Sequence, residues 1–188
     1  MRRTDAPWVI EVLEEPTYAF GSRDHSSRYQ REEILGDGTS LQLTSRHGVI
    51  AKVDEACVAS AVFGASGGAS GVHERTLAVL GDLAFLAVGP FVVGLRLPTL
   101  ETQWAREVDA ATCFGVHLCP DGRSLISHGE LEISRLTLAG ATLWRAGGPD
   151  IFTGDLSVGA TAVQVEDFNG DSFYFDLESG RSVVGAAR

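Results

Sequence analysis

The chain has 188 residues, a formal net charge of -10 and a single lysine, Lys52. Hydrophobic residues make up 44% and charged residues 21% of it, which is typical of a globular domain with a buried core and excludes a disordered chain. A surface of this sign repels phosphate backbones and attracts basic proteins. We therefore expect another protein as partner and no nucleic acid.

The N-terminal residues Met1–Pro7 carry two arginines without an apolar segment behind them, and the later apolar runs are interrupted by Gly, Pro or Arg. We expect neither a signal peptide nor a membrane span. The three cysteines, Cys57, Cys113 and Cys119, are an odd number in a chain without an export signal. This count favours reduced thiols and a cytoplasmic location.

Strands are the predicted elements along the whole chain. The segment Trp8–Leu13 predicts an N-terminal strand that Pro16 ends, and the run Arg28–Leu35 is the nearest approach to an amphipathic helix, but it is short. Apolar residues alternate with others after Gly89 and again after Gly170. A period of two places one set of side chains on a buried face of a strand.

A glycine between apolar runs recurs at even intervals and is expected to mark a strand-to-strand turn in each repeat. The four glycines are Gly48, Gly89, Gly129 and Gly170, with spacings of 41, 40 and 41. Trp104 and Trp144 keep the same interval, since they are 40 residues apart. Several independent features that agree on one period indicate a repeat architecture.

Shorter matches support the period. Asp37–Leu41 is matched by Asp121–Leu125, and Gly71–His73 is matched by Gly115–His117. The third copy changes phase by one residue after Ile133, which a β-bulge would absorb.

The stretches that end at Trp104, at Trp144 and around Gly180 each contain a strand, a Thr-Gly-like turn and a closing strand, which bears the Trp in the first two and Val183 in the last. They resemble the closing segment of quinoprotein-type and tryptophan-aspartate β-propeller repeats. The resemblance spans residues 30 to 188 and implies four-stranded blades packed face to face. It carries no functional residues, because blade consensus residues pack sheets.

We therefore predict one all-β domain over residues 1–188, with an N-terminal strand segment at 1–28 and four repeats of about 40 residues at 29–188. The repeats would form a small β-propeller, with Trp8–Leu13 completing the last blade and closing the ring. An open β-sandwich-like stack, or two chains that share one ring, would leave the same pattern. The oligomeric state is not predicted.

Equivalent positions in a ring of blades converge toward one axis. His73 and His117 are therefore expected to face a common pocket, with Glu74 and Asp155 nearby. Paired imidazoles and carboxylates suit general acid–base catalysis. The competing interpretation, which we favour, is that these histidines hydrogen-bond neighbouring loops.

Other polar residues have simpler interpretations. His47 and His128 precede turn glycines and are expected in the turns. Alternation would place Cys113, His117 and Cys119 on one face of a strand, but the two cysteines would lie about 20 Å apart, too far to share a zinc ion. We expect buried apolar cysteines, no metal and no cofactor.

Two motifs resemble functional loops. Gly64–Gly68 fits the G-x-S-x-G pattern of hydrolases, but no helical period follows it, so an inter-blade loop is expected. Asp167–Asp171 is similar to the calcium loops of integrin-type propellers, but it departs from them at Ser172 and Phe175. A hairpin turn explains the same residues.

The leading functional hypothesis is a non-enzymatic protein-binding module on a small acidic β-propeller-like scaffold, which engages its partner through loops or an end face. The alternative is a hydrolase or lyase with a His-containing central pocket formed by His73, Glu74, His117 and Asp155.

Overall fold

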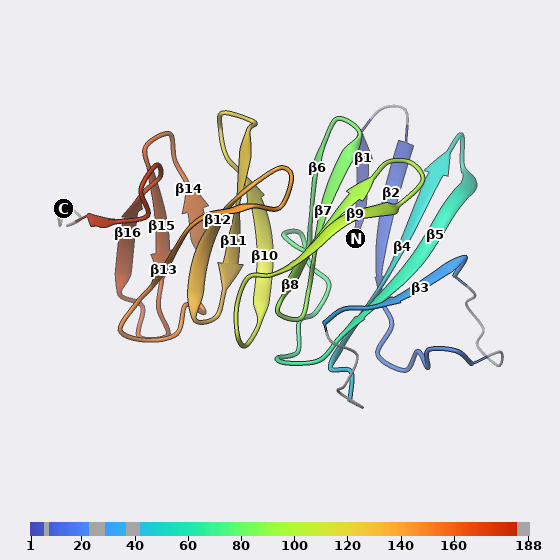
Figure 1. Ribbon diagram of the computed structural model, residues 1–188, viewed down its shortest axis with the longest axis horizontal. Coiled ribbons are helices and arrows are strands. Elements are labelled where there is room, and N and C mark those ends of the chain that lie inside the picture. Colours follow the sequence, from blue (N-terminus) through green and yellow to red (C-terminus); the bar gives the residue numbers. More distant parts are fainter. Residues whose placement is uncertain (6–7, 23–28, 37–41, 184–188) are drawn as a thin grey trace.

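A computed structural model describes residues 1–5, 8–22, 29–36 and 42–183, and in these ranges every regular element is a β-strand. The strands form four sheets, which follow one another along the long axis of the molecule (Figure 1). The predicted all-β class is therefore confirmed. Within the same ranges, no helix is long or apolar enough to cross a bilayer.

The first sheet has five strands in the order β1-β2-β4-β5-β3. Its strands are β1 (Arg2–Asp5), β2 (Trp8–Glu14), β3 (Arg31–Ile34), β4 (Ser45–Val53) and β5 (Ala56–Ala65). All neighbours are antiparallel except β3, which is parallel to β5. Parallel strands cannot be joined by a hairpin, so a crossover segment connects β3 and β5. This parallel pair distinguishes the first sheet from the other three.

The other three sheets are antiparallel meanders of four strands each. The second contains β6 (Leu77–Leu80), β7 (Leu83–Val88), β8 (Phe91–Arg96) and β9 (Glu101–Glu107). The third contains β10 (Cys113–Leu118), β11 (Ser124–Gly129), β12 (Glu132–Thr137) and β13 (Thr142–Gly147). The fourth contains β14 (Leu156–Val158), β15 (Ala162–Glu166), β16 (Ser172–Asp176) and β17 (Ser182–Val183).

Three separate apolar clusters hold the sheets together face to face, one at each junction. Phe63 and Leu86 belong to the cluster between the first and second sheets, and Phe85 and Leu125 to the next. Ile126 and Val163 belong to the last. Successive residues of a strand face opposite junctions, so Leu86 and Phe85 belong to different clusters, as the period-two pattern predicts.

The predicted turn glycines are correct in three of the four repeats. Gly89 and Gly170 lie in the β7–β8 and β15–β16 turns with φ of +53° and +84°, and Gly129 ends β11 before the β11–β12 turn. Gly48 instead lies inside β4, so its prediction as a turn is wrong. A Cβ there would collide with the ring of Tyr29, so Gly48 is needed for close packing.

The short matches have mixed outcomes. Gly122, with φ of +64°, lies in the predicted turn between β10 and β11. The matched stretch, 37–41, lies outside the described residues. The β-bulge expected in β12 after Ile133 is wrong, because β12 pairs with β11 without a register shift and Ile133 and Leu136 face opposite junctions. The register shift at Arg135 and Leu136 leaves the extra residue, Leu143, on β13.

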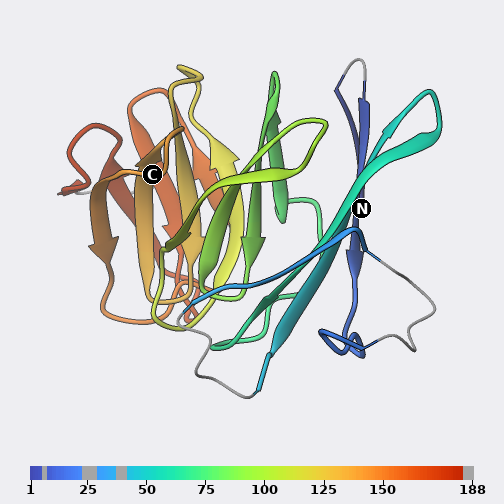
Figure 2. The same ribbon diagram turned by 45° about the vertical axis from the view of Figure 1, so that its right-hand side comes forward.

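The row of sheets is open, and the ring closure expected from Trp8–Leu13 does not occur. The first and fourth sheets lie at opposite ends of the row in Figure 1 and in the rotated view of Figure 2. Strand β2 pairs with β4 of the first sheet, so it completes that sheet and not the last one. The physical reason is local, because the apolar residues Ile10 and Val12 are buried in the core of the first junction.

The two end faces of the row have different covers. The first sheet is covered at Gly64 by the ring of Phe20, which is so close that a Cβ on Gly64 would lie 2.7 Å from it. Tyr29 donates a hydrogen bond to Glu15, at 2.6 Å, and its ring contacts that of Tyr18 edge to face. On the fourth sheet, alternation with the buried Val163, Val165 and Phe175 leaves an outward face that is mainly polar. That face carries Gln164, Glu166, Tyr174 and Asp176.

A tryptophan on the outer strand of one sheet contacts a turn glycine of the next. Trp144 of β13 lies over Gly180, where a Cβ would come within 2.6 Å of the indole, and its Nε1 donates to Leu177 O at 2.9 Å. Trp104 of β9 lies over Gly140 in the same way and donates to Leu138 O at 3.0 Å. The repeat tryptophans therefore join neighbouring sheets.

The first sheet uses an arginine for the same junction. Arg31 of β3 donates to the carbonyl of Leu100, which has φ of +57° and precedes Gly140 by one repeat interval. The guanidinium also lies 6.0 Å from the ring centroid of Phe63. A cation that donates hydrogen bonds replaces the indole at this position.

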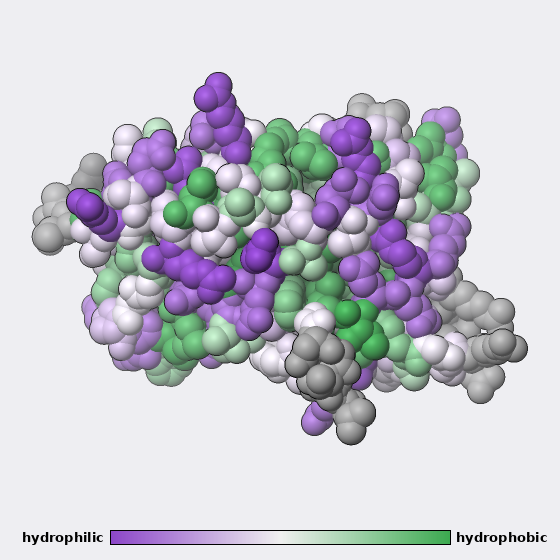
Figure 3. Space-filling model, in the orientation of Figure 1, coloured by the Kyte–Doolittle hydropathy of each residue, from purple (hydrophilic) through white to green (hydrophobic). Residues whose placement is uncertain are grey.

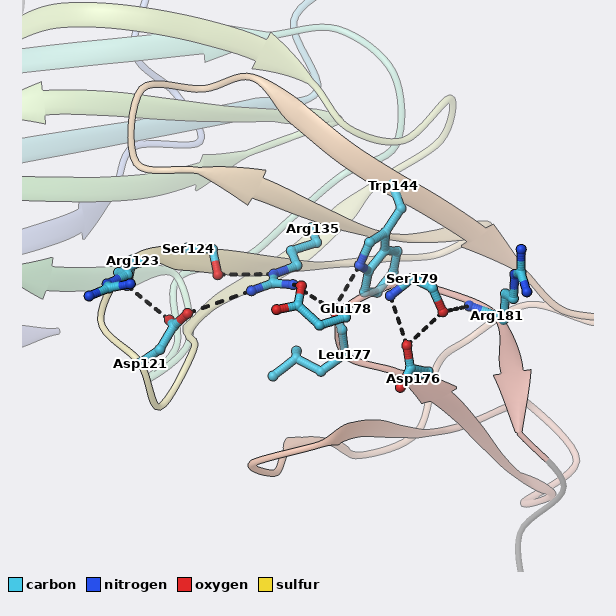
Figure 4. A network of polar contacts seen from close by, with 10 residues as sticks. All are labelled: Asp121, Arg123, Ser124, Arg135, Trp144, Asp176, Leu177, Glu178, Ser179 and Arg181. Atoms are coloured by element: carbon cyan, nitrogen blue, oxygen red, sulfur yellow. Dashed lines mark hydrogen bonds and ion pairs between the residues drawn. The ribbon is translucent and has the colours of Figure 1, made fainter.

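A buried arginine reinforces the last junction (Figure 4). Arg135 of β12 donates to Ser124 within its own sheet at 3.0 Å and to Leu177 O of the fourth sheet at 2.8 Å. Its charge is balanced by Glu178, at 2.6 Å, and by Asp121, at 3.6 Å. Three hydrogen bonds and two ion pairs thus offset the cost of burying the guanidinium.

The linkers between sheets are fixed to the hairpin turn of the sheet that follows. Ser70 Oγ accepts from Gly89 N at 2.9 Å, and the buried Asp109 accepts from the backbone N–H groups of Leu131 and Glu132 at 2.8 and 2.9 Å. Asp109 also accepts from two N–H groups of its own linker. These bonds position the linkers, which carry the candidate site.

We expect Gly180→Ala to lower the free energy of unfolding by about 3 kcal/mol, since the methyl group would overlap the Trp144 indole in addition to the cost of a positive φ.

 The measurement is urea-induced unfolding of the purified variant against the wild type.

Gly122→Ala is the matched control for the contact with Trp144. Gly122 has φ of +64°, close to the +67° of Gly180, but a Cβ there meets no atom within 4 Å. Only the backbone strain should remain, at about 1 kcal/mol. Equal losses in the two variants would show that the contact between Trp144 and Gly180 does not hold the last two sheets together.

Candidate functional site

The inner strands of the last three sheets, β6, β10 and β14, border two adjoining hollows. One hollow has a volume of about 660 Å³ and runs between the strands themselves. The other hollow, of about 760 Å³, lies where the linkers enter β6 and β14. Arg75, His117, Leu156 and Ser157 border both, so the two form one groove.

All four predicted site residues line the larger hollow. His73 and Glu74 lie in the linker before β6, His117 lies in β10, and Asp155 lies in the linker before β14. The four residues therefore lie together, although around a hollow of an open row of sheets and not at the axis of a ring. Their role in catalysis stays a prediction.

The two Gly-Val-His copies do not occupy equivalent positions. His73 lies in a linker, whereas His117 lies within a strand. In the pairing pattern, His117 opposite Ile126 corresponds to Ala78 opposite Phe85 and to Ser157 opposite Gln164. The histidine at this place is thus specific to the third sheet.

His73 has a structural role. Its Nε2 lies 2.6 Å from Phe114 O, and its Nδ1 accepts from Arg75 N at 3.2 Å. The ring therefore carries its proton on Nε2, since a neutral imidazole has one donor and one acceptor. Both nitrogens are occupied by backbone groups, as the loop-bonding interpretation predicted.

His117 differs from His73 because its Nε2 is buried and has no hydrogen-bond partner among the described residues. The side chain is only 9% exposed. Burial, followed by the charges of Arg75, His128 and His73, lowers the pKa of His117 to about 4. The ring is therefore neutral at pH 7, and its Nε2 is an unsatisfied buried polar atom beside the groove.

The prediction of His47 and His128 as turn residues is wrong. His47 lies in β4, fully buried, with Ala87 O and Ser70 O each 3.0 Å from a ring nitrogen. His128 lies in β11, and its Nε2 contacts Phe152 O at 3.2 Å. Both rings bridge to a neighbouring linker, and burial lowers the pKa of His128 to about 4.

The expected shared face of Cys113, His117 and Cys119 is also wrong. A register shift between Cys113 and Gly115 turns Cys113 toward the second sheet, whereas Cys119 faces the fourth. Cys113 and Cys119 are buried among apolar residues, as predicted, and Cys57 is exposed. In the described ranges, no group of three or more His, Cys, Asp or Glu side chains has the arrangement of a metal site.

The two loop motifs have the simpler structures expected for them. Gly64 and Ala65 end β5, and the following residues form the linker to β6, in which Gly68 N donates to Ala111 O at 2.8 Å. Asp167–Asp171 forms the β15–β16 hairpin turn. The Asp167 carboxylate accepts from Asn169 N and Asp171 N, both at 2.9 Å, so it stabilises the turn.

Sequence reasoning missed an exposed aromatic residue in this turn. Phe168 is 70% exposed, and Leu131 in the neighbouring β11–β12 turn is 42% exposed. We call this end of the third and fourth sheets, residues 129–132, 148–155 and 166–171, the turn face. It lies along the lower edge of those sheets in Figure 1, where Figure 3 shows hydrophobic surface. The sequence does contain a signal for this exposure, since an apolar residue stands directly before the Asn-Gly pair of a tight turn.

No protein-family model matches the sequence, and no curated protein matches it. Among solved structures, BamB from Moraxella catarrhalis, a β-propeller, is similar with a TM-score of 0.53 and 18% identity, over 73% of this chain and 42% of BamB. The fold is propeller-like. The chain thus spans well under half the length of BamB.

Two computationally designed propeller-like proteins are also similar. Ika4 has a TM-score of 0.52 and 12% identity, over 61% of this chain and 76% of its own. Ika8 has a TM-score of 0.51 and 13% identity, over 73% of this chain and 45% of its own. Identities this low show the fold alone, and they support the β-propeller resemblance of the repeats.

The buried histidines should make stability depend on pH. The pKa of His117 is about 4 in the folded chain and 6.5 in a free side chain, so the unfolded chain binds the proton first as the pH falls. Stability should be complete above about pH 6.5 and fall toward about pH 4. His117→Ser, which copies Ser157, should reduce that loss by at most about 3 kcal/mol.

The measurement is urea-induced unfolding of wild type and His117→Ser across this pH window. Adding a His128→Ala change should flatten the dependence further, because burial lowers the pKa of His128 in the same direction. If the single variant loses as much stability as the wild type, burial of His117 does not cause the effect.

Proposed function

We propose that this protein is a non-enzymatic binding module that docks a basic segment of another protein on its turn face. The observation that carries the proposal is the exposure of Phe168, 70% of whose surface is open at the tip of a hairpin. A large aromatic side chain with little conformational freedom is a typical anchor residue of protein interfaces. The propeller-like scaffold supports this function by presenting its turns side by side.

The turn that carries Phe168 is held firmly. Asp167 N donates to Asp171 O at 3.0 Å and Gly170 N to Asp167 O at 3.1 Å. Phe168 N donates to Ile151 O of the adjacent linker at 2.9 Å. A side chain presented by an ordered turn loses little further entropy on binding.

The surroundings of Phe168 favour a basic partner. Carboxylates surround the turn on both hairpins and on the linker between them, and they belong to Glu130, Asp150, Asp155, Glu166 and Asp171. Arg145 is a cation of the neighbouring β13, and it is paired with Glu132 at 3.2 Å. A negative surface around an apolar centre increases the association rate with a positive partner.

The hydrolase or lyase alternative stays a prediction with less support. A general base needs a ring nitrogen that is free to accept a proton from substrate, but both nitrogens of His73 contact backbone groups. His117 remains as a candidate base. A cytoplasmic location, expected from the cysteine count, is part of the proposal.

Photo-crosslinking tests the docking face. With benzoylphenylalanine in place of Phe168, we expect one dominant adduct in an extract of the native cells. Leu143→benzoylphenylalanine is the matched control, since Leu143 is 52% exposed but lies on the outer strand β13. It should give no such adduct.

Competition makes the result specific. Excess unlabelled wild type should suppress the adduct, whereas Phe168→Ala should compete about tenfold to thirtyfold less well, because about 2 kcal/mol of apolar burial is lost. Added salt should lower the yield, since it screens the carboxylates. Equal adducts at both positions, or none at Phe168, would contradict the proposal.

A further inference from the structure

We propose that the larger hollow beside the turn face is a binding site for a guanidinium group, filled by an arginine side chain of the docked segment. The inference rests on the proposed function, because it adds a specific residue to the basic segment. The hollow is bordered by the linker before β6, by β10 and β11, and by the linker before β14. Asp155 belongs both to this hollow and to the turn face.

The first argument is the buried ring of His117. Ala78 and Ser157 occupy the corresponding places in the second and fourth sheets, so a small side chain is enough for packing at this place. In the third sheet a histidine borders the hollow, and its Nε2 has no partner among the described residues. An unsatisfied buried polar atom costs free energy, which a hydrogen-bond donor in the hollow would recover.

The second argument is the charge of the walls. Glu74 and Asp155 are exposed on the two linkers. Among the described residues that line the hollow, Arg75 is the one permanent cation, and it lies 3.8 Å from Glu74. Burial lowers the pKa of His117 and of His128 to about 4, so neither ring adds positive charge at pH 7. The net charge of the lining favours a cation over an anion.

The third argument is the presence of an aromatic wall. Phe114 borders the hollow and is held edge to face against His128, with ring centroids 5.5 Å apart. A planar guanidinium stacks on an aromatic face and donates five hydrogen bonds in its plane, which suits two carboxylates and an imidazole. An ammonium group is compact and strongly hydrated, so it fits this combination less well.

The site can be tested without the partner by using N-acetyl-arginine amide as the probe. We expect it to shift the NMR signals of the His117 ring in a saturable way, with a Kd on the order of 1 mM, as is reasonable for one side chain. N-acetyl-citrulline amide has the same shape without the charge and should bind at least tenfold more weakly. N-acetyl-lysine amide should also bind more weakly than the arginine probe.

Two exposed carboxylates provide the variants. Asp155→Asn should weaken the arginine probe several-fold, and it should not affect folding because the Asp155 contact to Glu166 is made by its backbone carbonyl. Asp171→Asn, which removes a carboxylate of the turn face outside the hollow, should leave the affinity unchanged. Equal binding of the citrulline and arginine probes, or an unchanged affinity of Asp155→Asn, would overturn the assignment.

The two proposals fail in different experiments. If Phe168 gives no specific adduct but the arginine probe binds, the hollow is a guanidinium site and the docking face is wrong. If the adduct forms but the probe does not bind, the docking face stands and the guanidinium site is rejected.

Discussion

The architecture depends on the way in which one sheet attaches to the next, because no strand is shared between sheets. At two junctions an indole lies over a glycine turn, and the pairs are Trp104 with Gly140 and Trp144 with Gly180. The indole can lie over the turn only because glycine has no Cβ, so the contact depends on both residues of the pair. At the first junction Arg31 meets the same geometric need by bonding the carbonyl of Leu100.

The second set of attachments explains why the candidate sites gather at one end. Each linker uses a polar side chain to bind the following hairpin, through Ser70, Asp109 or Asp150. These contacts order the linkers that border the hollow and the turns that carry Phe168 and Leu131. The stabilising contacts and the proposed docking face thus lie at the same end of the sheets, which is usual for functional loops on a rigid scaffold.

Much of the fold could be predicted because the repeat interval and the period of two are properties of single segments. The turn glycines Gly89, Gly129 and Gly170 follow from this local pattern. Gly48 keeps the interval but serves a contact with Tyr29, and a spacing cannot distinguish a turn from a close approach. The pairing of β2 with β4 was missed for a similar reason, since the choice between two sheets depends on tertiary packing.

The candidate site, too, could be predicted only in part. The structure places His73, Glu74, His117 and Asp155 around one hollow. The predicted reason was wrong, because the row of sheets is open and the two histidines lie at different places in their repeats. The orientation of Cys113 could not be read from alternation, because a register shift reverses its side. The exposure of Phe168 depends on the neighbouring linker and is a property of the assembled turn face.

The open row has a further consequence for how such a chain can change in length. Cohesion comes from adjoining sheets only, while the outward side of the fourth sheet is mainly polar and that of the first is covered by its own chain. An internal duplication of the third sheet with its linker would therefore add a unit that offers the same tryptophan and accepts the same glycine turn as its parents. The scaffold would grow by about 10 Å without exposing a new apolar surface, as nearest-neighbour arrays permit.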